Sequence, residues 1–147
     1  MQLAIEQARL AERAGDVPIG AVIVRGGQVV AAAYNRRIID RDPTAHAELL
    51  AIRQAAAALG DWRLEECTLV VTLEPCCMCA GAIVLARIPR LVYGAADPKA
   101  GAVKTLYTLC NDSRLNHQVE VSAGVQGAQC GQLLTDFFRK QRAMGKK

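Results

Sequence analysis

The segment CTLVVTLEPCCMCAGAIVLA, residues 67–86, carries the strongest structural signal in this 147-residue chain. Its first part, residues 67–73, is rich in β-branched and apolar side chains and has the length of a buried β-strand. Pro75 is favoured in the first turn of a helix, and residues 76–86 form an apolar run with the length of a short helix. A buried strand that leads into a packed helix is typical of layered α/β folds.

The remainder of the chain alternates strand and helix patterns in the same way. Strands that alternate with helices predict an α/β domain whose sheet is covered by helices. No repeat, low-complexity tract or linker divides residues 1–147, so we expect a single domain. The expected elements are a helix over 3–11, a β-hairpin of 19–24 and 28–33, a helix over 45–59 with Thr44 as its N-cap, strands at 91–95 and 119–122, and a last helix over 127–142.

The composition is that of an ordinary globular protein, with 52% hydrophobic and 22% charged residues. No apolar run approaches the roughly 18–20 residues that span a bilayer, and the first residues do not resemble a secretory signal, so we expect a cytoplasmic location. The formal net charge of +4 is compatible with a polyanionic partner but is too small to require one.

Three of the six cysteines crowd into residues 76–79. Such crowding in a chain of this size favours a metal site over a disulfide framework. On a helix, Cys76 and Cys79 lie three positions apart and share one face, whereas Cys77 points elsewhere. The start of a helix also stabilises a thiolate, the form of cysteine that binds zinc.

His46 lies at the expected start of another helix and is predicted to bind one Zn²⁺ ion together with Cys76 and Cys79. Three protein ligands leave one coordination position open for water, as in catalytic zinc sites. The alternative is a closed structural site with Cys77 as the fourth ligand. Its two-residue spacing from Cys79 disfavours that arrangement.

Glu48 is the predicted catalytic residue. It follows His46 by two positions, so on a helix their side chains diverge by about 200° and do not bind the metal together. A carboxylate with a pKa of about 4.3 would take a proton from free water, with a pKa of about 15.7, at a cost of about 15 kcal/mol. Zinc can lower the pKa of water to about 7 and that cost to about 4 kcal/mol, so we expect the metal and Glu48 to act as a unit.

His46-Ala47-Glu48 and the run from Pro75 to Cys79 match the known His-x-Glu and Pro-Cys-x-x-Cys signature of zinc-dependent nucleobase deaminases. Over nearly its whole length the chain also resembles the bacterial tRNA-specific adenosine deaminases, which convert the wobble adenosine of an anticodon to inosine. The matching segments are Val17-Pro18-Ile19-Gly20-Ala21-Val22, Asn35-Arg36, Thr44-Ala45-His46-Ala47-Glu48, Thr72-Leu73-Glu74-Pro75-Cys76, Met78-Cys79-Ala80-Gly81-Ala82, Asn116-His117 and Asp136-Phe137-Phe138-Arg139.

The resemblance implies a cytidine deaminase-like fold, a three-layer α/β/α sandwich with a mixed five-stranded sheet. It implies a homodimer with one zinc ion per subunit, whose partner is the anticodon stem-loop of a tRNA. The implied reaction is hydrolytic deamination at C6 of adenosine, with Glu48 as the proton shuttle and ammonia as the leaving group. The substrate-binding residues expected on this basis are Asn35, Ala47, Asp97 and Asn116.

The last predicted helix combines aromatic and basic residues. The resemblance implies that Phe137, Phe138 and Arg139 contact the RNA, and aromatic stacking beside basic side chains that neutralise phosphates is how single-stranded RNA is recognised. Taken alone, the same pattern also describes packing residues beside a solvated helix face. The basic side chains of this end are Arg139, Lys140, Arg142, Lys146 and Lys147.

Two other functions remain compatible with the residues themselves. A deaminase of a free base or nucleoside, such as guanine, cytosine or cytidine, would need the same zinc and glutamate but no RNA surface. A non-catalytic, zinc-stabilised RNA-binding module would use the metal only for folding. Outside the metal site, we expect Cys67, Cys110 and Cys130 to be small buried residues, His117 to form a hydrogen bond, and Trp62 to pack between a helix and a strand.

Overall fold

The computed structural model describes residues 1–146 and contains one mixed five-stranded sheet. The strand order is β2-β1-β3-β4-β5; β1 pairs antiparallel with both β2 and β3, whereas β3, β4 and β5 run parallel. The strands are β1 (Gly20–Arg25), β2 (Gln28–Tyr34), β3 (Cys67–Leu73), β4 (Arg90–Ala95) and β5 (Glu120–Ser122). The predicted hairpin is therefore confirmed, and Gly26 and Gly27 take the positive φ angles that its turn requires.

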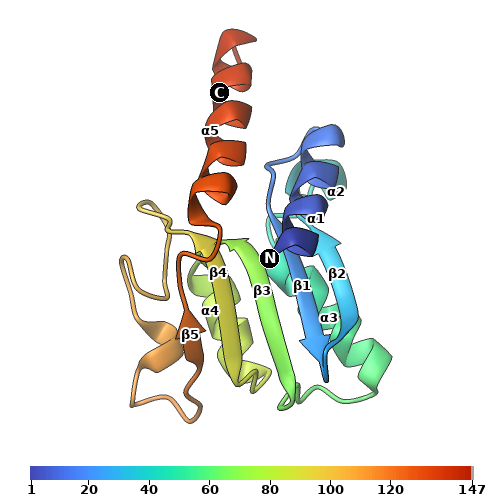
Figure 1. Cartoon of the computed structure of the whole chain (residues 1–147), viewed down its shortest axis with the longest axis vertical. Coiled ribbons are helices and arrows are strands. Elements are labelled where there is room, and N and C mark those ends of the chain that lie inside the picture. The colour runs from blue at the N-terminus through green and yellow to red at the C-terminus, as the bar shows by residue number, and fades with distance from the viewer. Residues whose placement is uncertain (147) are drawn as a thin grey trace.

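Helices cover both faces of the sheet (Figure 1). The first helix α1 and the last helix α5 lie on one face, and α3 and α4 lie on the other. The helices are α1 (Gln2–Arg13), α2 (Arg37–Asp40), α3 (Ala47–Leu59), α4 (Cys77–Leu85) and α5 (Gly127–Ala143), with a 3-10 turn η1 at Leu109–Asn111. The predicted three-layer α/β/α sandwich is confirmed.

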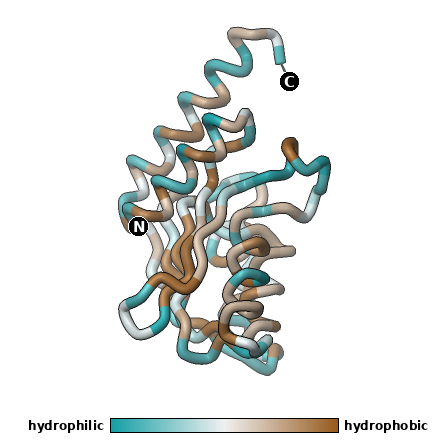
Figure 2. The backbone as a smooth tube through the Cα atoms, turned by 90° about the vertical axis from the view of Figure 1, so that its right-hand side faces the viewer, coloured by the Kyte–Doolittle hydropathy of each residue, from teal (hydrophilic) through white to brown (hydrophobic). Residues whose placement is uncertain are grey.

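The sheet is the middle of the hydrophobic core. In Figure 2, which shows the sheet from its side, hydrophobic stretches run along the strands between the two helical layers. Leu69, Val71 and Leu91 on the central strands are completely buried. Gly20 allows α1 to approach β1, because a β-carbon on this residue would lie only 2.0 Å from the carbonyl oxygen of Ala4. None of the helices in residues 1–146 combines the length and apolar character that a membrane span needs.

Two local expectations were wrong, and one short helix was not predicted. Thr44 does not cap α3: its hydroxyl donates to Asp42 instead, and His46 occupies the N-cap position. The short helix that the sequence did not predict is α2, which residues 37–40 form after β2. Trp62 does not pack between a helix and a strand; it is 54% exposed, with the guanidinium of Arg63 stacked 4.3 Å from its ring centroid.

Candidate active site

The two predicted metal-binding segments meet at the ends of two helices. His46 is the N-cap of α3 and Cys76 is the N-cap of α4, and both have an extended backbone. Extended geometry at an N-cap turns the side chain back across the helix start, where the helix dipole is positive. Cys79, in the first turn of α4, is completely buried. The starts of α3 and α4 thus bring three ligand side chains, one histidine and two cysteines, to one point.

The geometry of these three side chains fits a zinc ion. His46 Nδ1 lies 3.8 Å from Cys76 Sγ and 3.6 Å from Cys79 Sγ, and all three ligand atoms lie within 4.8 Å of one another. Tetrahedral zinc, with bonds of about 2.0–2.1 Å to nitrogen and 2.3 Å to sulfur, places such atoms about 3.6 Å apart. Cys77 is exposed and stands outside this group. The structure therefore brings His46 together with Cys76 and Cys79, and not with Cys77, as a candidate metal site.

The electrostatics of the cluster favour a metal-binding thiolate. A hydrogen bond from the thiol of Cys79, supported by His46, lowers the pKa of Cys76 to about 3. The same contact raises the pKa of Cys79, because its proton is held by the Cys76 thiolate, and burial raises it further. The pKa of His46 is raised by the hydrogen bond with Cys76. The cluster therefore holds protons that a divalent cation would displace.

Glu48 lies beside the cluster without joining it. Its side chain is 4% exposed, and its Oε2 atom has no hydrogen-bond partner among residues 1–146. Burial raises the pKa of Glu48 to about 7. A buried carboxyl oxygen without a partner is costly, and such atoms mark places where a substrate or water completes the hydrogen bonding.

His46, Glu48 and Cys76 line one cavity of about 700 Å³. Its walls come from the loop that connects α1 to β1, from the start of α2, from the loop after β4 and from α5. This volume lies within the range of sites that bind small molecules. The other lining residues include Val17, Ile19, Asn35, Arg37, Leu73, Glu74, the run 95–100, Leu134, Thr135, Phe138 and Arg142.

Asn35 presents a defined polar atom to this cavity. Its amide Nδ2 donates to Asp16 Oδ1 at 2.9 Å, while its Oδ1 has no partner in the described chain. Asp16 is completely buried and also accepts from the backbone amides of Val17 and Ile38, at 2.8 and 2.7 Å. A carboxylate accepts and does not donate, so Asp16 fixes which end of the Asn35 amide stays free. The free atom is an acceptor.

The remaining predicted contacts divide into those at the cavity and those away from it. Asp97 and Phe138 line the cavity, and Phe138 is 44% exposed. Phe137 is buried, and the methyl group of Ala47 lies in the core, so only the backbone of Ala47 faces the helix start. Arg139 is exposed and pairs with Asp136 at 2.6 Å.

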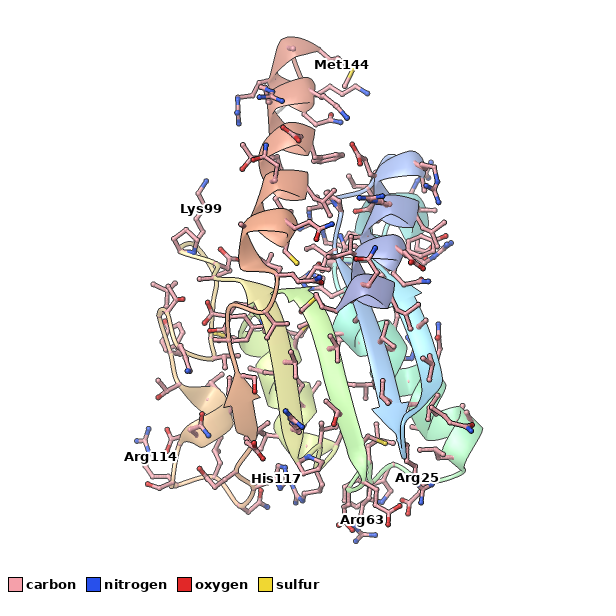
Figure 3. The ribbon with its side chains drawn as sticks, viewed as in Figure 1. Arg25, Arg63, Lys99, Arg114, His117 and Met144 are labelled. Carbon is pink, nitrogen blue, oxygen red and sulfur yellow. The ribbon has the colours of Figure 1, made fainter. Side chains whose placement is uncertain are left out.

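Asn116 lies far from the cavity within one chain. It is exposed and precedes β5, near the amino-terminal end of the parallel strands. Figure 3 shows its neighbour His117 at one end of the sheet and Lys99, a cavity residue, at the other. A contact between Asn116 and the substrate of the same subunit is therefore not supported by this geometry. His117 Nε2 lies 2.7 Å from the carbonyl oxygen of Ile88, so its predicted hydrogen bond is confirmed.

The sequence analysis missed two cations on the cavity wall, Arg37 and Lys99, and named a third, Arg142, only as one of the basic side chains of the last helix. Arg142 follows Phe138 by four positions on α5, so helical spacing alone places both on one face. Nothing in the local sequence singles out Arg37 or Lys99. Lys147 of the basic tail lies outside the described residues.

The family model that matches this chain is that of the MafB19-like deaminases, over residues 1–142. Two curated relatives are both tRNA-specific adenosine deaminases. The protein from Bacillus subtilis is 52% identical over 142 residues, which are 97% of this chain and 88% of that protein. The protein from Haemophilus influenzae is 46% identical over 143 residues, which are 97% of this chain and 83% of that protein.

Solved structures give the same picture. A structure from studies of A-to-I editing by tRNA:A34 deaminases at the wobble position matches with a TM-score of 0.88 and 46% identity, over 91% of this chain and 97% of the other. A guanine deaminase from Nitrosomonas europaea matches with a TM-score of 0.81 and 26% identity, over 92% and 81% of the two chains. The fold is thus shared by enzymes for different purine substrates.

Proposed function

The chain belongs to the MafB19-like deaminases and, among them, to the tRNA-specific adenosine deaminases, and we propose that it hydrolyses the wobble adenosine of a tRNA anticodon to inosine. The reaction consumes one water molecule and releases ammonia. The observation that carries this proposal is the meeting of a zinc-binding triad with a buried, unpartnered carboxyl oxygen in one cavity. The whole chain is proposed to act as one deaminase domain.

His46, Cys76 and Cys79 would hold the zinc ion, which when bound supplies a Lewis acid that lowers the pKa of water to about 7. Burial raises the pKa of Glu48 towards that value, which lowers the cost of the proton transfer below about 4 kcal/mol. Glu48 takes a proton from the attacking water and delivers it to ring nitrogen N1 as the C6–O bond forms. It then moves the second proton to the departing amine as the C6–N bond breaks.

The rest of the cavity suits a nucleotide within RNA. Arg37, Lys99 and Arg142 provide positive charge for phosphates, and the exposed ring of Phe138 offers a surface for base stacking. The free Oδ1 of Asn35 requires a donor from the substrate, such as a ribose hydroxyl. These features support an anticodon stem-loop as the partner. Asp97, Arg139 and the backbone of Ala47 remain proposed contacts near the same opening.

We also propose that the enzyme is a homodimer that works in the cytoplasm with its tRNA. Support for the dimer comes from α4, an apolar helix that leaves Cys77 exposed and Leu85 69% exposed. Exposed apolar side chains on a packed helix favour a protein interface. Light scattering on the purified protein tests this: a mass of about 32 kDa, twice the 15.8 kDa of one chain, is expected, and a mass of one chain would refute it.

The test of the activity is direct. Zinc-loaded protein is incubated with an anticodon stem-loop that carries a wobble adenosine, and the product nucleosides are identified by mass spectrometry. Inosine is expected at the wobble position only, and a stem-loop with the adenosine moved one position away serves as the control. Guanine, cytosine and cytidine are assayed in parallel, because turnover of a free base or nucleoside in preference to the stem-loop would favour the other deaminase class.

A further inference from the structure

Glu74 is a buried carboxylate that the proposed reaction does not use. It directly precedes Pro75 and the metal-binding segment, and it is 2% exposed. No cation pairs with it among residues 1–146. Instead, every described partner of its carboxylate belongs to the segment from Asp97 to Thr105 that follows β4.

The two oxygens of Glu74 bind different parts of that segment. Oε1 accepts from the backbone amides of Val103, Lys104 and Thr105 at 3.2, 2.7 and 2.9 Å. Oε2 accepts from the amide of Asp97 at 3.0 Å and from the hydroxyl of Thr105. Five donors on one carboxylate offset the cost of its burial, and hydrogen bonds of this kind hold the pKa of Glu74 down at about 2.

The segment held by Glu74 is also the wall of the cavity. Residues 95–100 line it, and residues 96–108 contain no regular helix or strand that would otherwise fix their place. Asp97 organises this wall in turn, because its carboxylate accepts from the amides of Lys99 and Ala100 at 2.9 and 3.2 Å. Glu74 therefore connects the metal-binding segment on one side to the substrate wall on the other.

Gly101 shows how closely the two parts fit. A β-carbon at this residue would lie 2.4 Å from Glu74 Oε2 and 2.6 Å from the carbonyl oxygen of Asp97. Both distances are far below van der Waals contact, so only glycine allows this approach. The backbone around Gly101 is shaped to bring Asp97 onto the Glu74 carboxylate.

We propose that Glu74 is a positioning residue, which sets the Asp97–Ala100 wall at a fixed distance from the metal-binding turn and so determines how tightly the RNA binds. The proposal rests on the proposed function and deepens it. Glu74 lines the cavity, but both of its carboxylate oxygens are occupied by donors of the 97–105 segment and neither binds a metal ligand. A residue that only positions a binding wall affects KM more than kcat, because binding is lost equally in the ground state and the transition state.

The sharpest test is Glu74→Gln, because it replaces only one of the two carboxylate oxygens by an amino group, and the two oxygens have different partners. The glutamine oxygen can keep the three amides of residues 103–105, and the hydroxyl of Thr105 can rotate to accept from the new amino group. The amide of Asp97 cannot accept, so it alone loses its partner. We expect hydrogen exchange at the Asp97 amide to accelerate at least about ten-fold, with protection at 103–105 largely kept.

In activity assays with the stem-loop, Glu74→Gln should raise KM about ten-fold while kcat falls less than about three-fold, at unchanged zinc content. Glu66→Gln is the matched control, because Glu66 is exposed, bonds only to Arg25 and lies at the other end of β3. An unchanged Asp97 exchange rate, a fall in kcat at constant KM, or the same changes in Glu66→Gln would overturn the proposal.

Gly101→Ala keeps the proposal testable if Glu74→Gln does not fold. Its added methyl group would clash with the Glu74 carboxylate and so disturb the same contact from the side of the loop. It should give the same rise in KM and in the hydrogen-exchange rate of the Asp97 amide, and wild-type values of both would refute the proposal. Where both variants fold, their effects on KM should be less than additive, because they break one contact. If the wild-type protein makes no inosine, the proposed function fails, but the exchange measurement still decides whether Glu74 positions the wall.

Discussion

Replacing Asp16 with asparagine should weaken both the fold around the cavity and the binding of the substrate. The carboxylate of Asp16 accepts from Val17 N, Ile38 N and Asn35 Nδ2 at 2.7–2.9 Å. Asparagine has one oxygen, so at best it keeps Val17 and Asn35 on that oxygen and turns its amino group towards the amide of Ile38. The part-buried amide of Ile38 and the longer contact from Ile39 N at 3.4 Å then lose their acceptor, and the donors of Val17 and Asn35 lose a charged one.

The magnitude follows from these contacts. Loss of the charge-assisted hydrogen bond from the part-buried amide of Ile38 costs about 1.5–3 kcal/mol, and the weakening of the bonds from Val17 and Asn35 brings the expected loss to about 2–4 kcal/mol. For a chain of this size, each kcal/mol lowers the melting temperature by about 2–4 °C, so a fall of roughly 5–15 °C is expected in calorimetry. The Asn35 amide also loses the contact that fixes its orientation, and KM for the stem-loop should rise about ten-fold.

Asp61→Asn is the matched control, because Asp61 also accepts from a backbone amide, that of Arg63, but lies on the surface outside the cavity. It should change the melting temperature by less than about 2 °C and leave KM as it is. A wild-type melting temperature and KM in Asp16→Asn would refute the view that Asp16 holds Asn35 and the start of α2 in place.

Other variants test single parts of the site. Cys76→Ala should lose the zinc ion in metal analysis, whereas exposed Cys77→Val should retain one zinc per chain; loss of zinc from Cys77→Val would show that the wrong cysteine pair was chosen. Phe138→Ala should raise KM with little change in melting temperature, whereas Phe137→Ala should cost about 3–5 kcal/mol of stability because its ring is buried. In a plot of the logarithm of the RNA-binding constant against the logarithm of the salt concentration, Arg142→Gln should make the slope less steep by about 0.7. An unchanged slope would show that Arg142 does not contact a phosphate.

The parts of the fold that could be predicted from sequence depend on short-range patterns. The β3 strand, the β1–β2 hairpin and α5 follow from apolar spacing and turn residues within a few positions. The four-residue helix α2 escaped prediction because the amide of its Ile38 is held by Asp16, twenty-two positions earlier. Thr44 was a reasonable N-cap from sequence, but neighbouring Asp42 competes for its hydroxyl.

The candidate site divides in the same way. His46, Glu48 and the cysteines could be identified because each short motif places its chemistry at a helix start. Glu74 and Asp16 could not, because their roles depend on partners 19 to 31 positions away that only the folded chain brings near. Substrate contacts were the least predictable: Phe138 and Asp97 reach the cavity, whereas Asn116 stands at the other end of the sheet.

The most direct test of the central claim compares inosine formation by the zinc-loaded wild-type protein and by Glu48→Gln on the same wobble-adenosine stem-loop. We predict that the wild-type protein converts the adenosine. The variant should retain one zinc ion and the RNA affinity but turn over at least about 10²- to 10⁴-fold more slowly, the range that a proton-transferring side chain contributes. Comparable turnover by the variant, or no inosine from the zinc-loaded wild-type protein, would contradict the account.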